Sequence, residues 1–367
     1  MTTSVWWIRR DLRLADNQAL AAATRFGEQV VPAYILDPAL LESPYVGEKR
    51  LSFLFANLRE LDGELRQHGS RLVVRKGNPQ VELAGLLSEV KADAIFAEED
   101  ISPYAHRRDA AVRRELPLRL CAGVMVHPPG TVLKQDGEPY IVFTPYKRTW
   151  LSRPRPSRAE VLAPPSTIVT PEALSSDPIP ETRLPREFAF PPGERAARRR
   201  LAEFVGSKSL IDYEDRRNRT DLDGTSRLSP YLRFGLISAR EALVSAYERR
   251  AEVQELEEPT TGIDSWINQL IWREFYMTVL HFFPDVLAGN FRSEYDNLAW
   301  REDPDALEAW QQGRTGYPMV DAAMRQMNQT GWMHNRGRMI VASFLVKDLL
   351  IDWRLGERYF MTQLIDG

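Results

Sequence analysis

The sequence predicts two structural units of different class, an N-terminal α/β domain with a parallel sheet and a C-terminal domain made of helices. Three observations support this. Short apolar runs alternate with amphipathic stretches over residues 1–126, proline is dense from about 150 to 193, and a helical period continues from 195 to the end. A chain of 367 residues is long enough for two or three domains. The boundaries that we predict are 1–130 for the α/β domain, 131–200 for a linker and 201–367 for the helical domain.

The first unit contains five short apolar runs that read as strands. They lie at 5–8, 30–36, 71–75, 93–98 and 118–126. The amphipathic stretches between them predict a helix capped near Asp16 and helices at 48–68, 79–90 and about 104–115. Strands joined by helices in this order form a parallel, doubly wound five-stranded sheet with right-handed crossovers. After the first strand the chain reads RRDLRLADN without a glycine, which disfavours a dinucleotide-binding dehydrogenase.

Composition limits the class of protein. With 43% hydrophobic and 27% charged residues, the chain is typical of a globular protein. Its N-terminus, MTTSVWWIRRDLRL, lacks a basic region followed by an apolar core, so we expect it in the cytoplasm. It has no apolar run of about 18 residues, so we expect no membrane association. The single Cys121 cannot form an internal disulfide, and no metal site is predicted. The net charge of −3 means that binding to nucleic acid requires a local basic patch.

The proline-rich segment from 150 to 193 cannot sustain a helix or a central strand, because proline lacks the backbone donor that both need. We therefore predict a long extended connection. Beyond it, an aromatic-rich helix is predicted over 264–283, with a start at Asp264, and another over 335–351.

The most distinctive stretch is TGYPMVDAAMRQMNQTGWMHNRGRM, residues 315–339. If it is helical from about 333, Asn335, Arg338 and Met339 lie three and four residues apart on one face. An amide, a guanidinium and a thioether on one face suit a flat ring with polar edges. An ordinary amphipathic helix with Met339 in the core is an alternative of equal weight.

Two further motifs suggest ligand binding. GTSRLSPYLRFG, residues 224–235, brings hydroxyls and backbone amides to a turn before a helix, which suits phosphate, although an ordinary helix cap is the commoner explanation. On the helix at 264–283, four side chains share a face that could stack bases, although such a face also arises by chance on a half-exposed helix. These four are Gln269, Trp272, Arg273 and Tyr276.

Taken together, several phrases resemble the photolyase and cryptochrome family. They are WWIRRDLRLADNQAL, PYIVFTPYKRTW, GTSRLSPYLRFG, NQLIWREFY, and the stretch 315–339 followed by SFLVKDLLIDWRLGERYF. The likeness covers nearly all 367 residues and is greatest to class I cyclobutane pyrimidine dimer photolyases. It implies an antenna domain, a linker and a helical domain that holds a U-shaped FAD. It also implies light-driven repair of UV-damaged DNA by electron transfer from reduced FAD, with a blue-light cryptochrome photoreceptor as the alternative.

The resemblance also implies roles for individual residues. The FAD-binding residues would be Tyr213, Thr225, Ser226, Arg227, Leu228 and Ser229, together with Arg338 paired to Asp366 at the flavin edge. The DNA-binding residues would be Gln269, Trp272, Arg273, Tyr276, Asn335 and Arg336. The residues at the reacting lesion would be Trp272, Asn335, Met339 and Gln269. The electron relay would contain Trp300 and Trp353.

Two of these positions indicate which lesion is repaired. Relatives that repair the (6-4) photoproduct have histidines at the positions of Asn335 and Met339, where this chain has none, so we expect the cyclobutane dimer. Gln269 stands where cyclobutane photolyases usually have a glutamate. A glutamine keeps the shape and adds a donor but cannot carry negative charge, so we expect repair with lower efficiency.

An antenna chromophore is also implied. Arg50 and Asp100 match the relatives that use 8-hydroxydeazaflavin, whereas Ala105 stands where folate-using relatives have a glutamate, so 8-hydroxydeazaflavin is favoured. Both charged residues are equally compatible with an ordinary surface position. The family continues beyond QLIDG into the helices that close the FAD domain, and we expect this sequence to be a fragment rather than a damaged homologue. We also expect a monomer.

Overall fold

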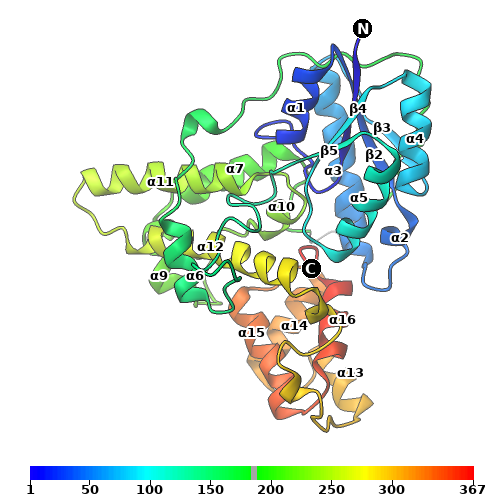
Figure 1. Ribbon diagram of the computed structural model, residues 1–367. Coiled ribbons are helices and arrows are strands. Elements are labelled where there is room, and N and C mark those ends of the chain that lie inside the picture. The colour runs from blue at the N-terminus through cyan, green and yellow to red at the C-terminus, as the bar shows by residue number, and fades with distance from the viewer. Residues whose placement is uncertain (183–187) are drawn as a thin grey trace.

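A five-stranded parallel sheet forms the centre of the N-terminal part in the computed structural model, which describes residues 1–182 and 188–367 (Figure 1). The strands are β1 (Thr3–Ile8), β2 (Gln29–Leu36), β3 (Val73–Lys76), β4 (Ala94–Glu98) and β5 (Leu118–Cys121), in the order β3-β2-β1-β4-β5. Every neighbouring pair is parallel. The predicted fold class is therefore confirmed. The last strand is shorter than predicted and ends at Cys121. Two residues further on, at Gly123, the Glu98 carboxylate fills the space that a side chain would need.

Helices cover both faces of the sheet. They are α1 (Gln18–Phe26), α2 (Pro38–Leu41), α3 (Glu48–Gln67), α4 (Pro79–Val90) and α5 (Pro103–Glu115). Trp6 and Ile8 of β1 pack with α1 and α3 on one face, whereas Trp7 packs with α4 and α5 on the other. This is the burial on both faces that a parallel sheet requires. The first helix is capped near Asp16, as predicted, and the capping residue is Asn17, whose side chain accepts from the Leu20 amide.

The linker is largely extended, as its proline content predicts. It contains the helix α6 (Phe143–Leu151) and the short turn η1 (Arg158–Glu160). Beyond these it follows the N-terminal domain, where Ile168 N donates to His68 O at 2.9 Å and Val30 N donates to Val169 O at 2.9 Å. Residues 183–187 of the predicted linker lie outside the described part. The segment around residues 168–169 is thus bound to the α/β domain, whereas α6 packs against α12 (Thr261–Phe282) of the helical domain.

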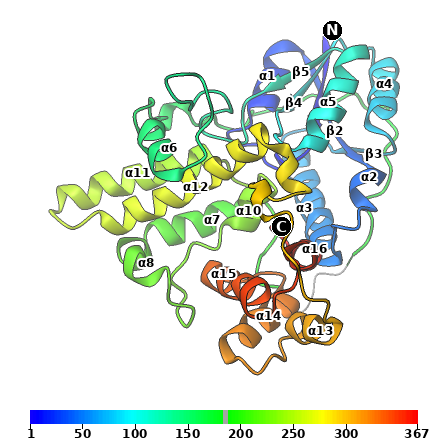
Figure 2. The same cartoon turned by 60° about the horizontal axis from the view of Figure 1, so that its bottom comes forward.

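The remaining regular elements are helices and helical turns. They are α7 (Glu194–Val205), α8 (Lys208–Ile211), α9 (Tyr213–Arg216), α10 (Ser229–Arg233), α11 (Ala239–Glu255), α12 (Thr261–Phe282), η2 (Pro284–Leu287), η3 (Ser293–Tyr295), α13 (Pro304–Gln312), α14 (Pro318–Thr330), α15 (Asn335–Ser343), η4 (Phe344–Asp348) and α16 (Trp353–Gln363). Helix α11 lies beside α12, and α13 to α16 form a separate lobe (Figure 2). That lobe has its own core around Trp310, Met324 and Leu345. Among the described helices, none is long and apolar enough to cross a bilayer.

Two predicted helix boundaries were wrong. Helix α12 begins at Thr261 rather than Asp264, because the Asp264 carboxylate accepts from Arg250 and from the Thr260 hydroxyl instead of capping the helix. The helix predicted over 335–351 ends at Ser343 and continues as a wider π turn. Leu350 then adopts a left-handed conformation with φ of 57°, which ends helical geometry before α16.

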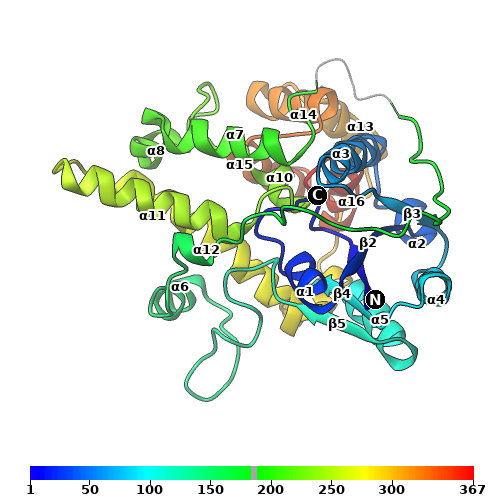
Figure 3. The same ribbon diagram turned by 90° about the horizontal axis from the view of Figure 1, so that it is seen from above.

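The two domains contact each other through backbone as well as side chains. Leu12 N donates to Phe234 O at 3.2 Å, and a Cβ on Gly235 would overlap the Arg10 carbonyl. Arg13 links the same places, since its guanidinium donates to Gly235 O at 3.1 Å and pairs with Glu98 at 2.7 Å. Helices α3 and α16 also lie side by side (Figure 3). The domain joint is therefore closely packed.

Candidate functional site

The N-terminus of α15 presents three polar or polarisable side chains to solvent. Met339 Sδ lies 3.9 Å from Asn335 Nδ2 and 3.8 Å from Arg336 Nη1, and the Met339 side chain is 53% exposed. The helix begins at Asn335 because His334 caps it: His334 Nδ1 accepts from Arg336 N at 3.1 Å. Asn335, Arg336 and Met339 therefore form one open cluster, which we call the α15 cluster.

Arg338 does not share this open cluster, so the single face predicted for Asn335, Arg338 and Met339 is wrong. Its guanidinium turns away to Asp366, with N–O distances of 2.8 and 3.0 Å, and to Met333 O at 2.9 Å. The Asp366 carboxylate is almost fully buried, with 2% of the side chain exposed. The predicted ion pair is thus present, and it leaves α15 with one charged pair and one open cluster.

The loop that contains Thr225 to Ser229 has many unused donors. Arg200 binds the carbonyls of Ser226 and Thr225 at 2.8 and 3.1 Å. Within the described part of the chain, the backbone amides from 225 to 229 donate no hydrogen bond. With the hydroxyls of Thr225, Ser226 and Ser229, these amides form a donor set suited to phosphate and ribityl oxygens.

Positive charge gathers beside this loop. The Arg227 guanidinium lies 5.1 Å from the centre of the Trp332 ring, and Trp332 Nε1 donates to Ser229 Oγ at 3.3 Å. Burial lowers the pKa of His334, and the charges of Arg227, Arg336 and Arg338 lower it further. A neutral His334 keeps Nδ1 available as an acceptor for the cap. Tyr213, another predicted FAD residue, is buried on α9 against Phe204.

The aromatic face of α12 is only partly as predicted. The Trp272 indole lies face to face with Phe143 of α6, with ring centres 3.6 Å apart and planes 7° apart. Tyr276 is 63% exposed, and the Gln269 amide donates to Ser265 O at 3.1 Å. Arg273 is turned away from this group: it donates to Val124 O at 3.0 Å, and burial lowers its pKa to about 10. The structure therefore does not bring Arg273 together with the other predicted DNA contacts.

Phe143 is the residue that the sequence reasoning missed on this face. It begins a helix inside the segment assigned to the linker, within the phrase PYIVFTPYKRTW. Phe143, Tyr146 and Trp150 recur at spacings of three and four, and this helical period could have revealed it.

The segments of the two predicted relay tryptophans lie close together. Arg301 N, next to Trp300, donates to Leu350 O at 2.7 Å, near the start of α16. Trp353 Nε1 donates to Asn290 Oδ1 at 3.0 Å, and the Arg354 guanidinium lies 4.9 Å from the centre of its ring. Both side chains are half-buried.

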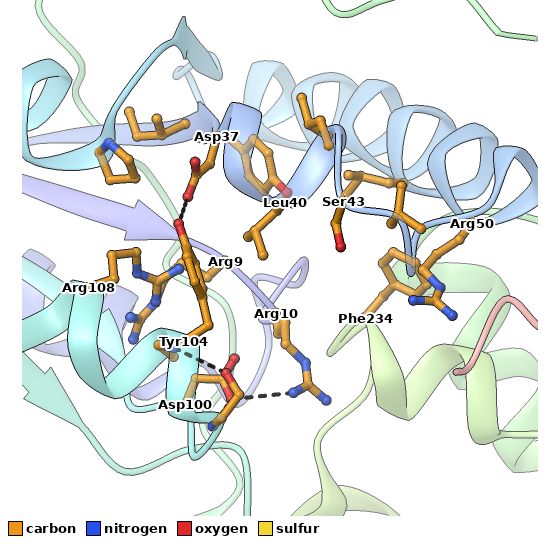
Figure 4. A pocket seen from close by; sticks show the side chains of 18 of the residues that line it. Arg9, Arg10, Asp37, Leu40, Ser43, Arg50, Asp100, Tyr104, Arg108 and Phe234 are labelled. Carbon is orange, nitrogen blue, oxygen red and sulfur yellow. Dashed lines mark hydrogen bonds and ion pairs between the residues drawn. The ribbon is translucent and has the colours of Figure 1, made fainter. Parts of the chain in front are cut away.

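A separate cavity of about 320 Å³ lies at the edge of the N-terminal sheet, and both predicted antenna residues line it (Figure 4). Asp100 pairs with Arg10 at 3.3 Å; burial opposes ionisation of this carboxyl, but Arg10 and Arg9 outweigh it and hold its pKa well below the usual range. Arg50 donates to Leu364 O at 3.0 Å, and burial lowers its pKa to about 10.

Other walls of this cavity were not foreseen from the sequence. Tyr104 of α5 donates to Asp37, and Arg108 lies beside it, 4.7 Å from the centre of the Trp7 ring. Phe234 enters from the helical domain (Figure 4), and its neighbour Arg233 also lines the cavity. The repulsion of Arg10, with burial, lowers the pKa of Arg233 well below its usual value. The cavity thus combines aromatic and apolar walls with clustered guanidinium groups.

Known proteins match this architecture. A family model described as DNA photolyase matches residues 4–166, and one described as the FAD binding domain of DNA photolyase matches residues 266–367. Deoxyribodipyrimidine photo-lyases from Synechococcus sp. and Escherichia coli are each 40% identical, over 99% and 100% of this chain and 78% and 79% of theirs. The crystal structure of a bacterial class III photolyase from Agrobacterium tumefaciens superposes with a TM-score of 0.92 at 33% identity, over 100% of this chain and 77% of that one.

These similarities do not test the prediction of class I. They do establish the family, because sequence identities of 40% extend through both domains. The chain belongs to the photolyase and cryptochrome family.

Proposed function

We propose that this chain is a deoxyribodipyrimidine photo-lyase, an enzyme that binds FAD and repairs pyrimidine dimers in UV-damaged DNA when it absorbs light. The observation that supports this most directly is the division of α15 into the open cluster of Asn335, Arg336 and Met339 and the Arg338–Asp366 pair. A repair flavoenzyme needs both, since one group of residues must meet the lesion while another meets the cofactor.

The helical domain is the FAD-binding domain, and its residues fit the cofactor. The free amides and hydroxyls from Thr225 to Ser229 would hold the phosphates and ribityl chain, and Arg338 would lie at the flavin edge with Asp366 balancing its charge. When bound, reduced and excited by light, FAD would supply one electron to the lesion. The chain's own residues orient the lesion and compensate charge, as flavoproteins generally do.

The lesion would be held by the α15 cluster and the α12 face. Trp272 offers an aromatic surface on which a flipped base stacks, Arg336 reaches a phosphate, and the amides of Asn335 and Gln269 donate to base carbonyls. Neither Asn335 nor Met339 can serve as a proton donor as a histidine would. This favours the cyclobutane dimer, whose ring splits after electron transfer without acid catalysis.

The N-terminal cavity is our candidate antenna site. It joins Arg50 and Asp100, the two residues that the resemblance assigns to an 8-hydroxydeazaflavin, and its size and aromatic walls suit a flat tricyclic ring. We also propose the division into an antenna domain at 1–130, a linker at 131–200 and a lesion-binding FAD domain at 201–367. A monomer in the cytoplasm fits a repair enzyme that contacts DNA through one exposed face.

Repair is tested by incubating FAD-loaded, photoreduced protein with an oligonucleotide that carries one thymine dimer, in light and in darkness. Loss of the dimer in light alone supports the proposal. Selective lesion binding without repair would instead indicate a DNA-binding module. Stable flavin absorbance with neither binding nor repair would indicate a cryptochrome photoreceptor.

A further inference from the structure

An aromatic stack joins the linker to the proposed lesion wall. Phe143, the first residue of α6, lies flat against the Trp272 indole, with centres 3.6 Å apart and planes 7° apart. Phe275 supports the pair from the side, with its ring edge-on to Phe143 at 5.9 Å and to Trp272 at 5.6 Å. One face of the indole is therefore already covered by protein.

Helix α6 is itself fixed to α12. Trp150 Nε1 donates to the buried Glu274 carboxylate at 2.7 Å, and the hydroxyls of Tyr146 and Thr278 lie 3.4 Å apart. The same carboxylate accepts from the amides of Val126 and His127, so it ties three segments together. Phe143 is thus presented to Trp272 by a helix that cannot easily move away.

Tyr276 is the other described ring nearly parallel to Trp272. Its centre lies 5.5 Å from the indole, its plane is tilted by 24°, and its side chain is 63% exposed. The closely stacked, half-buried Phe143 restricts rotation of the indole more than the looser, solvent-exposed Tyr276 does.

We propose that Phe143 is a positioning residue for DNA repair: it holds the Trp272 indole in one orientation, so that a base of the flipped dimer stacks on the face opposite Phe143. This inference rests on the proposed function and adds a residue from the linker to the lesion site. The energetic reason is preorganisation. An indole held in place loses no rotational freedom when the lesion binds, so more of the stacking energy appears as affinity.

The experiment compares four FAD-loaded proteins: the parent, Phe143→Leu, Phe143→Tyr and Thr149→Ala. Leucine keeps apolar volume but removes the stacked ring, whereas tyrosine keeps it. Thr149→Ala is the matched control: Thr149 lies on the same helix as Phe143, and the change removes its 2.8 Å contact with Tyr140, which precedes the helix, without touching the stack. Affinity is measured for an oligonucleotide with one thymine dimer and for the undamaged strand, and repair is measured per bound lesion.

We expect Phe143→Leu to weaken lesion binding by about two- to tenfold, the range that corresponds to one aromatic pair. Binding of undamaged DNA, FAD content and repair per bound lesion should stay at the parent values. Phe143→Tyr should restore lesion affinity, and Thr149→Ala should resemble the parent.

Two results would overturn the inference alone. One is a Phe143→Leu protein that discriminates the lesion as well as the parent does; the other is equal loss for both DNAs in Phe143→Leu and Thr149→Ala, which would show that α6 only supports the fold. If the parent itself fails to prefer damaged DNA, the proposed function fails, and this inference fails with it.

Discussion

The N-terminal cavity and the α12–α15 surface are built in opposite ways. In the cavity, Asp100 and Arg50 are 7% and 8% exposed, and their charges are balanced by Arg10 and by backbone carbonyls. On the α15 cluster, Asn335 is exposed and Met339 is 53% exposed; the groups contact one another at Met339 Sδ, and Arg336 also donates to Asn218 Oδ1 at 2.6 Å. The charged groups of the cavity already have partners within the protein. The side chains of the α15 cluster remain largely open to solvent.

This difference follows from the physics of each ligand. A small ring must be enclosed to lose enough water, so its site needs walls on several sides. A DNA strand brings its own surface and charge, so its site can remain open until it binds. If the comparison is right, substitutions in one region should leave binding in the other unchanged.

The largest effect should come from Arg338→Leu, which leaves the buried Asp366 carboxylate without its partner. Breaking a buried pair is costly, and with Arg338 a quarter exposed we expect the free energy of unfolding to fall by about 2 kcal/mol. Because the guanidinium proposed to lie at the flavin edge is lost as well, the variant should also retain much less FAD. Flavin retained after gel filtration measures this. Arg325→Leu, which removes the more exposed pair with Asp321 on α14, is the control and should retain FAD. Full retention by Arg338→Leu would contradict the assignment of Arg338 to the flavin edge.

The second effect concerns the cavity. Asp100→Asn keeps the shape but removes the charge that faces Arg10, and we expect 8-hydroxydeazaflavin to bind about tenfold more weakly, because a hydrogen bond to a charged group contributes about 1.5–3 kcal/mol. Fluorescence titration checks this, with Asp136→Asn on an exposed loop as the control. FAD content should not change. If it falls together with antenna binding, the two regions are coupled, which would contradict their independence.

The third effect is smaller and concerns the lesion. Gln269 donates to Ser265 O, a contact that an ionised glutamate cannot make, so Gln269→Glu should release the side chain toward the open site. We expect repair of the cyclobutane dimer to rise by a few-fold, on the scale of one hydrogen bond. Both lesions are assayed for parent and variant. Repair confined to the (6-4) photoproduct would contradict the cyclobutane assignment.

The smallest effect depends on pH. Because the pKa of His334 is lowered in the folded protein, protons bind the unfolded chain more readily, and stability falls as pH drops through about 6.5 and below. Protonation of Nδ1 also removes the cap of α15, which contributes about 1 kcal/mol. His334→Asn keeps a capping acceptor that does not titrate. Its melting temperature should therefore fall less than the parent's between pH 8 and pH 5.5; an identical fall would exclude His334 as the cause.

The fold was predictable because its strands and helices have strong periodicity. The parallel sheet followed from apolar runs such as that of β1, and the extended linker followed from proline. Two helix ends were not predicted. The Asp264 carboxylate accepts from Arg250 instead of capping α12, and the left-handed Leu350 ends helical geometry after α15. Neither choice is visible in a period of 3.6 residues, because both depend on residues brought near by folding.

For the candidate site, the sequence predicted which residue types take part. It did not predict the direction in which each side chain points. The pairing of Arg338 with Asp366 followed from the family resemblance and is present. Spacing alone placed Arg338 beside Met339, whereas the buried carboxylate of Asp366 draws the guanidinium to the other side. The helical period of its segment could have indicated that Phe143 lies on a helix, but the partners of Phe143 and Arg273, Trp272 and Val124, are set by tertiary packing.

The close contact between Gly235 and Arg10 has a consequence for light collection. With no room for even a methyl group between them, the α/β domain and the helical domain cannot slide or rotate past each other at this point without breaking the joint. Excitation transfer between two chromophores depends on the distance between them and on the angle between their transition dipoles. An antenna in the N-terminal cavity and a flavin in the helical domain would thus keep a constant distance and angle. The efficiency of energy transfer between them would then not vary with domain motion.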